Sequence, residues 1–72
     1  MLTTQELLNN NFTEKNVNGI TIYTKNNYAV TYLRDKQVWA PCHIANNEVT
    51  IGRIYINTLK ELNDLILEAE KM

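Results

Sequence analysis

The chain has 72 residues, of which 44% are hydrophobic and 21% charged, and its formal net charge is −1. A chain of this length buries only about 60% of the surface that its unfolded form exposes, so residues 1–72 are expected to form a single domain with one core. The composition excludes the disordered and membrane-protein classes. Apolar runs are short and no signal-peptide pattern begins the chain, which predicts a cytoplasmic protein that does not enter a membrane.

Catalytic and metal-binding chemistry has little material in this sequence. One cysteine cannot form an intramolecular disulfide, and one cysteine with one histidine provides no metal-ligand set of the usual spacing. Cys42 and His43 are neighbours in a predicted strand, so they point to opposite faces and cannot form a nucleophile–base pair. Two glycines provide no Gly-rich phosphate loop. We therefore expect a protein that is not an enzyme and uses neither a metal nor another cofactor.

A short helix is predicted at the start of the chain. Thr3 and Glu6 have the spacing of a capping box, and Leu2 and Leu7 occupy the two positions of a hydrophobic staple. Three asparagines at positions 9–11 favour the end of this helix.

A longer helix is predicted at the end of the chain, where Thr58 and Glu61 repeat the capping-box spacing. On a helical wheel, its apolar residues fall on one face, which consists of Leu59, Leu62, Leu65, Ile66, Ala69 and Met72. This helix is therefore expected to pack by one stripe, with Leu67 exposed on the polar side.

Four β-rich runs lie between the helices, at residues 18–25, 28–34, 37–45 and 48–56. Asn26-Asn27 and Asn46-Asn47 suit two-residue hairpin turns because asparagine tolerates positive φ, whereas Asp35-Lys36 fits less well and suggests a longer loop. The predicted fold is therefore α+β, in the order α-β-β-β-β-α, with a four-stranded antiparallel meander.

Short turns set the register, which pairs Tyr32 with Trp39 and Leu33 with Val38. Alternation then breaks after Ile51. A one-residue β-bulge at Gly52, opposite Pro41, would restore it, because proline cannot donate to the ladder. With that bulge the predicted pairs are Trp39–Tyr55, Val38–Ile56 and Ala40–Ile54.

This register sorts the side chains into two faces. One face is aliphatic, with Ile20, Ile22, Ala29, Thr31, Leu33, Val38, Ala40, Cys42, Ile44, Val49, Ile51, Ile54 and Ile56. The other holds Tyr23, Tyr28, Val30, Tyr32, Trp39, Pro41, His43 and Tyr55. Both helices are expected to cover the aliphatic face, which would leave an open aromatic face of roughly 400 Å² or more.

An open aromatic face predicts binding to a partner, because tyrosine and tryptophan are enriched at protein interfaces. The candidate partner-binding residues are Tyr23, Tyr28, Tyr32, Trp39, His43 and Tyr55. The expected occupant is a partner protein or a second copy of the chain. Two alternatives remain open: the aromatic residues reflect sheet propensity alone, or they stack single-stranded nucleic acid with Lys25, Arg34, Lys36 and Arg53 near the phosphates.

Charge weakens the nucleic-acid alternative, since residues 1–56 carry five Lys/Arg against four Asp/Glu and residues 57–72 carry two against four. Eleven asparagines suggest an AT-rich coding sequence, such as that of a low-GC bacterium or its phage. We therefore hypothesise an accessory or inhibitor protein of a phage or mobile element, which acts by occupying the surface of a host protein.

Overall fold

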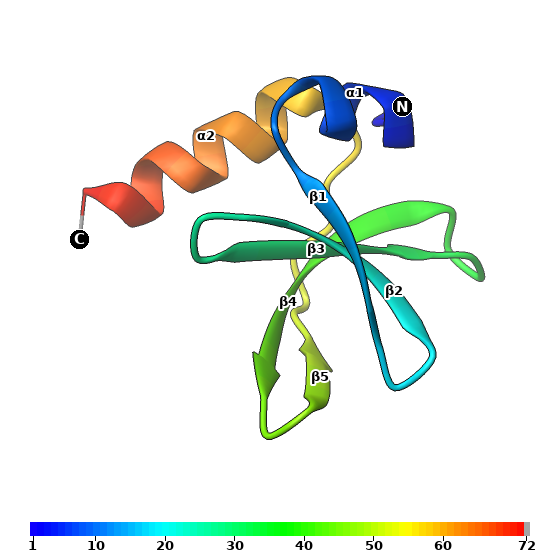
Figure 1. Ribbon diagram of the computed structural model, residues 1–72. Coiled ribbons are helices and arrows are strands. Elements are labelled where there is room, and N and C mark those ends of the chain that lie inside the picture. Colours follow the sequence, from blue (N-terminus) through cyan, green and yellow to red (C-terminus); the bar gives the residue numbers. More distant parts are fainter. Residues whose placement is uncertain (72) are drawn as a thin grey trace.

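A short helix, a five-stranded antiparallel sheet and a longer helix make up the fold in a computed structural model that describes residues 1–71 (Figure 1). The elements are α1 (Thr4–Asn9), β1 (Thr13–Val17), β2 (Ile20–Lys25), β3 (Tyr28–Leu33), β4 (Val38–Ala45), β5 (Glu48–Ile51) and α2 (Leu59–Glu70). The strands follow the order β1-β2-β3-β4-β5, so the predicted α+β class and antiparallel meander are confirmed. The predicted number of strands, four, is wrong.

The strand missing from the prediction is β1, which pairs with β2 from Thr13 opposite Thr24 to Val17 opposite Ile20. Only Val17 among its five residues is buried, so its hydrophobic pattern is too weak to indicate a strand. The turn that follows is Asn18-Gly19, with φ values of 51° and 82°. Asparagine followed by glycine is the strongest short-range signal for a hairpin, and here it marked β1 where hydrophobicity did not.

The predicted register of the central strands is confirmed. Tyr32 pairs with Trp39 and Leu33 with Val38, and β4 pairs with β5 so that Ile44 lies opposite Val49. The β3–β4 connection is a four-residue loop, 34–37, which ends in a left-handed residue, Gln37 (φ 55°).

The irregularity after β5 lies where it was predicted but has a different size. The Gly52 N–H donates to the Pro41 carbonyl at 2.8 Å, after which regular pairing stops. Pairing resumes at one bridge, Trp39 opposite Ile56, where the two residues exchange both backbone hydrogen bonds. The chain therefore gains two residues against β4, not one, and the predicted pairs Trp39–Tyr55, Val38–Ile56 and Ala40–Ile54 are wrong.

A two-residue displacement preserves the alternation of side chains, so Ile56 shares the face of its partner Trp39. Ile56 is buried at 1% exposure, whereas Ile54 and Tyr55 loop outward and are 56% and 45% exposed. Proline explains the outward loop, because Pro41 has no N–H to hold a regular partner strand.

The prediction that the helices cover the aliphatic face is also wrong: they cover the aromatic face. The main core joins residues of that face to both helices and consists of Leu2, Leu7, Phe12, Tyr23, Val30, Trp39, Ile56, Leu62 and Ile66. Trp39 is only 3% exposed, and its indole N–H donates to the Leu2 carbonyl at 2.7 Å. The side chains up to Ile51 were therefore sorted correctly by parity, whereas Ile56 was placed on the wrong face. The face that the helices cover was also assigned the wrong way round.

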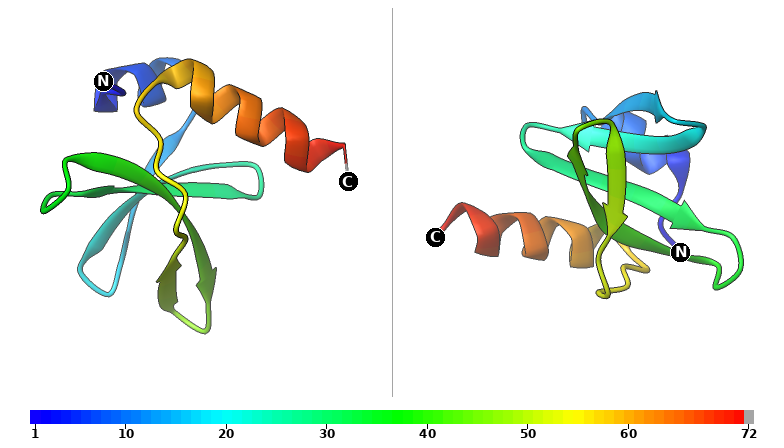
Figure 2. Two further views of the ribbon diagram at one scale, coloured as in Figure 1. Left: turned by 180° about the vertical axis from the view of Figure 1, so that it is seen from behind. Right: turned by 90° about the horizontal axis from the view of Figure 1, so that it is seen from below.

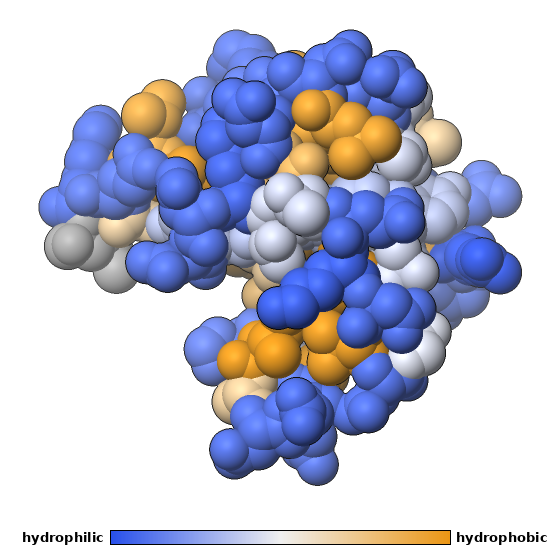
Figure 3. Space-filling model, viewed as in Figure 1, coloured by the Kyte–Doolittle hydropathy of each residue, from blue (hydrophilic) through white to orange (hydrophobic). Residues whose placement is uncertain are grey.

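The aliphatic face is buried by curvature of the sheet itself. Val17, Ile22 and Ala29 form a second cluster against three half-buried residues, Cys42, Ile44 and Val49. The sheet curls into a half-barrel, which brings the β1–β2 hairpin toward the β4–β5 hairpin, and the Asn18 amide donates to the Asn47 carbonyl across their tips. In Figure 3, apolar atoms lie between these two hairpins with hydrophilic atoms around them.

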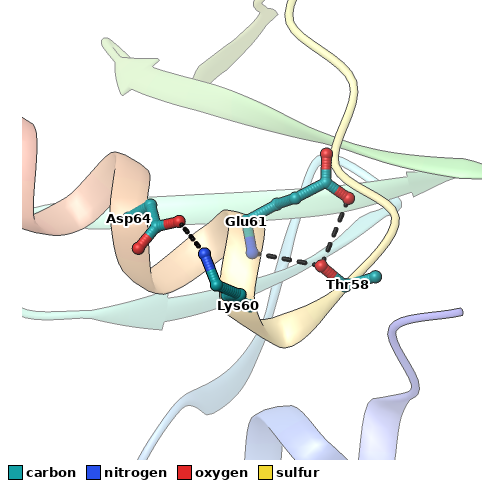
Figure 4. Close-up of polar contacts among 4 residues, drawn as sticks. All are labelled: Thr58, Lys60, Glu61 and Asp64. Carbon is teal, nitrogen blue, oxygen red and sulfur yellow. Dashed lines mark hydrogen bonds and ion pairs between the residues drawn. The ribbon is translucent and has the colours of Figure 1, made fainter.

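Only the first part of α2 packs on the sheet. Leu62 and Ile66 are buried, while the helix continues outward beyond the strands to the C-terminal end (Figures 1 and 2). Thr3 and Glu6 form the complete capping box that was predicted. At Thr58 only half of the predicted box forms: the Thr58 hydroxyl accepts from the Glu61 N–H at 3.1 Å (Figure 4), but the Glu61 carboxylate accepts from the Asn57 N–H. The position of Met72 in the predicted stripe lies outside the described residues. No helix within residues 1–71 is both long and apolar enough to cross a membrane.

Replacing Trp39 by Phe should lower the free energy of unfolding by about 1–3 kcal/mol, because the buried Leu2 carbonyl loses its donor. The change also removes the only tryptophan, so urea unfolding should be followed by far-ultraviolet circular dichroism. Leu67→Ala is the matched control: Leu67 is 55% exposed, and its loss should change stability by no more than about 0.5 kcal/mol. An unfolding midpoint unchanged in Trp39→Phe would contradict the role assigned to the indole.

Candidate functional site

The six predicted binding residues do not form one open surface. Tyr23 and Trp39 are buried, at 7% and 3% exposure, and Tyr28 and Tyr32 are half-buried against the main core. His43 is exposed on β4, and Tyr55 lies in the outward loop after β5. The open aromatic face is thus a wrong prediction, because α1, α2 and the segment around Leu2 cover its centre.

Three of the six residues nevertheless line one pocket of about 870 Å³, which we call the α1 pocket. It lies between the N-terminal segment and strands β1 to β4, and it is lined by Met1, Leu2, Thr3, Thr4, Glu14, Gly19, Ile20, Thr21, Tyr23, Thr31, Tyr32, Arg34 and Trp39. Its size is within the range of about 300–1,000 Å³ that is typical of ligand-binding pockets.

Aromatic rings in mutual contact form part of the wall of the α1 pocket. The ring centroid of Trp39 lies 5.6 Å from that of Tyr23, with the planes at 68°, and 5.3 Å from that of Tyr32. These are favourable edge-to-face and tilted arrangements, so the three rings support one another. The cross-strand pairing of Tyr32 with Trp39, which the register predicted, is what brings two of them together.

Two apolar side chains at the pocket are unusually open to solvent. Met1 is 74% exposed and Ile20 is 36% exposed, and both line the α1 pocket. Ile20 was expected in the core, but it occupies the first position of β2, beyond the reach of either core cluster. The pocket therefore combines a buried aromatic wall with exposed aliphatic groups.

The polar groups of the pocket differ in whether the chain already satisfies them. The Tyr23 hydroxyl donates to the Glu14 carboxylate at 2.8 Å, and the Thr31 hydroxyl donates to the Thr21 carbonyl at 2.9 Å. Arg34 is exposed and forms no ion pair with another residue within 1–71. A guanidinium at the pocket is thus available to an external acceptor.

Burial is the main reason that the pKa of Tyr23 is raised above its ordinary value, and the hydrogen bond to Glu14 raises it further. Both effects favour the neutral phenol, since the neighbouring carboxylate opposes a second negative charge. Tyr23 is therefore a hydrogen-bond donor at neutral pH, and it holds Glu14 in position beside the pocket.

The surroundings of Cys42, the most nucleophilic side-chain type in the chain, disfavour its reactivity. Burial raises the pKa of the Cys42 thiol, which disfavours the reactive thiolate. Cys42 is half-buried on the aliphatic face of β4, and the adjacent His43 is exposed on the other face. Within residues 1–71, no three His, Cys, Asp or Glu side chains are grouped so that they could hold a metal ion.

Sequence reasoning missed Glu14, Ile20 and the N-terminal residues as parts of the pocket. Glu14 was missed together with β1, although the Asn18-Gly19 turn carried the signal for that hairpin. Given the hairpin, Glu14 opposite Tyr23 would have followed from the register. Arg34 was considered only as a phosphate contact.

Comparison of the chain with protein-family models, with curated proteins and with solved structures finds no match. The structural class of the protein is therefore given by its fold, which is a small α+β domain with a curled antiparallel sheet.

Raising the pH should destabilise the fold through Tyr23. Its pKa is raised in the folded state, so its contribution to stability is fully present below the ordinary tyrosine value of about 10 and is lost as pH rises through the folded value. The tyrosinate titration of Tyr23, obtained as the ultraviolet difference between the wild type and Tyr23→Phe, should lie above that value. Glu14→Gln should shift this titration downward, and a Tyr23 that titrates at the ordinary value would contradict the assigned pairing.

Proposed function

We propose that this chain is a small non-enzymatic protein that binds a partner protein at the α1 pocket. The observation that carries the proposal is the convergence of buried aromatic rings, exposed Met1 and Ile20, and available Arg34 on one open pocket. Aromatic residues and arginine are enriched among the residues that dominate protein–protein binding. Of the six aromatic-face residues predicted to bind a partner, the proposal keeps the three that line this pocket, Tyr23, Tyr32 and Trp39.

The expected contact is a projecting side chain of the partner that enters the pocket. An apolar side chain would cover Met1 and Ile20 and pack on Tyr32, which would remove apolar area from water. A carboxylate of the partner would pair with Arg34, since the planar guanidinium suits bidentate contact with carboxylates. Glu14 already accepts the Tyr23 hydroxyl and would oppose a second acidic group deeper in the pocket.

Nucleic acid is a weaker candidate. Of the four basic residues that sequence analysis considered for phosphate contacts, Lys25 lies over the Phe12 ring at 5.6 Å and Lys36 over the Tyr55 ring at 5.2 Å. A base that enters the pocket would find Trp39 only 3% exposed, so little of the strongest stacking surface is accessible. An accessory or inhibitor role in a phage or mobile element stays a prediction.

Ile20→Glu should abolish capture of the partner, because it adds a charge at the apolar part of the pocket. The measurement is a pull-down from lysate of the source organism with purified wild-type and variant proteins, followed by mass spectrometry. Leu67→Glu is the matched control, since it adds the same charge at an exposed leucine of α2 outside the pocket. Capture of the same proteins by wild type and Ile20→Glu would reject the pocket as the site.

Two measurements test the alternative ligands of the α1 pocket, which are a second copy of the chain and single-stranded nucleic acid. Analytical ultracentrifugation should find a monomer for wild type; a dimer that Ile20→Glu dissociates would replace the partner protein by a second copy of the chain. Fluorescence anisotropy with labelled single-stranded DNA and RNA at two salt concentrations should show no binding. Binding that weakens as salt rises and is lost in Arg34→Ala would favour nucleic acid instead.

A further inference from the structure

A second hollow lies between α2 and the loop that follows β5. This groove of about 270 Å³ shares no lining residue with the α1 pocket, and we call it the α2 groove. Its apolar part consists of Ile54, Tyr55, Ile56 and Leu65, and its polar part consists of Glu61, Asp64 and Glu68.

The apolar part is exposed because of the irregularity opposite Pro41. Regular pairing with β4 stops at Gly52 and resumes only at Ile56, so Ile54 and Tyr55 project outward beside α2. A methyl group on Gly52 would lie 3.2 Å from both the ring and the carbonyl of Pro41, so the close approach that starts the loop suits glycine. The backbone path between Gly52 and Ile56 thus causes the exposure of Ile54 and Tyr55.

The polar part is uniformly acidic. Glu61, Asp64 and Glu68 are spaced by three and four residues on α2, which places all three carboxylates on one side of the helix. They extend over roughly 10 Å of helix length, at about 1.5 Å per residue. A row of this length suits several positive charges along a chain better than one metal ion, and no group of such side chains within residues 1–71 is placed to hold a metal.

Two lysines of the chain each contact one residue that lines the groove. Lys60 donates to Asp64 at 2.9 Å (Figure 4), and this hydrogen bond raises the pKa of the Lys60 ammonium. The Lys36 ammonium lies 5.2 Å from the centroid of the Tyr55 ring, and its interaction with Tyr55 raises its pKa. Asp64 and Tyr55 are therefore groove residues that each have an ammonium group beside them.

We propose that the α2 groove binds a basic segment of a partner protein, with an apolar side chain of that segment against Ile54 and Leu65 and its Lys or Arg side chains facing the carboxylates of α2. Charge complementarity selects this occupant, because an acidic segment or a nucleic-acid phosphate would face three negative charges. Glu68 is the carboxylate best placed to receive the new charge, since Asp64 pairs with Lys60 and Glu61 accepts from the Asn57 N–H.

The test uses the full chain and a short synthetic peptide in which lysine and leucine alternate. Nuclear magnetic resonance titration of the ¹⁵N-labelled protein at low salt should move the amide signals of Ile54, Tyr55, Leu65 and Glu68. Glu68→Lys should weaken binding by on the order of tenfold, because it reverses one of three facing charges. Ile54→Ser should weaken binding as well, without lowering the unfolding temperature, because Ile54 is 56% exposed.

Glu70→Lys is the matched control. It makes the same charge change two residues further along the same helix, and Glu70 does not line the groove. It should alter affinity by less than about twofold, given the weakness of exposed charge pairs. Equal loss in Glu68→Lys and Glu70→Lys would overturn the proposal in favour of unspecific attraction, as would signal changes that map to the α1 pocket. Binding of a matched glutamate–leucine peptide with equal affinity would also overturn it.

Discussion

The buried hydrogen bond from the Trp39 indole to the Leu2 carbonyl is the contact on which most of this fold depends. Leu2 also donates its N–H to Asn57, and Trp39 pairs with Ile56 through both backbone groups. Three segments that are far apart in sequence therefore meet at one tryptophan. Because α1 begins after Leu2 and α2 begins after Asn57, this junction positions both helices on the same face of the sheet.

Side-chain parity could be predicted from the sequence as far as Ile51, whereas the face that the helices cover could not. The short turn at Asn46-Asn47 sets the β4–β5 register, and the observed pair of Ile44 with Val49 follows from it. The β3–β4 pairs, such as Tyr32 with Trp39, follow from the connection around Asp35-Lys36. Parity says nothing about curvature, however. The prediction assumed that a sheet buries only the face beneath its helices, but a curled sheet buries its second face against itself, as Ile22 and Ala29 do here.

The candidate site was predictable only in its aromatic part, for a related reason. Tyr23, Tyr32 and Trp39 were recognised because their residue types and alternation indicate one face. Glu14 and Ile20 depend on a strand whose polar sequence hides it, and the contribution of Met1 and Leu2 depends on where the chain terminus crosses the sheet. The contact of Leu2 with Trp39 joins residues 37 positions apart in the sequence, and no local pattern encodes it.

The chain has a single tryptophan, and it lies at the junction of all these elements, in the wall of the α1 pocket. Its fluorescence therefore reports on two processes through one chromophore. Unfolding would expose the indole to water and shift its emission to longer wavelength. A molecule that binds in the α1 pocket would instead change the emission intensity while the indole stays buried. The protein thus carries an intrinsic optical probe that needs no label.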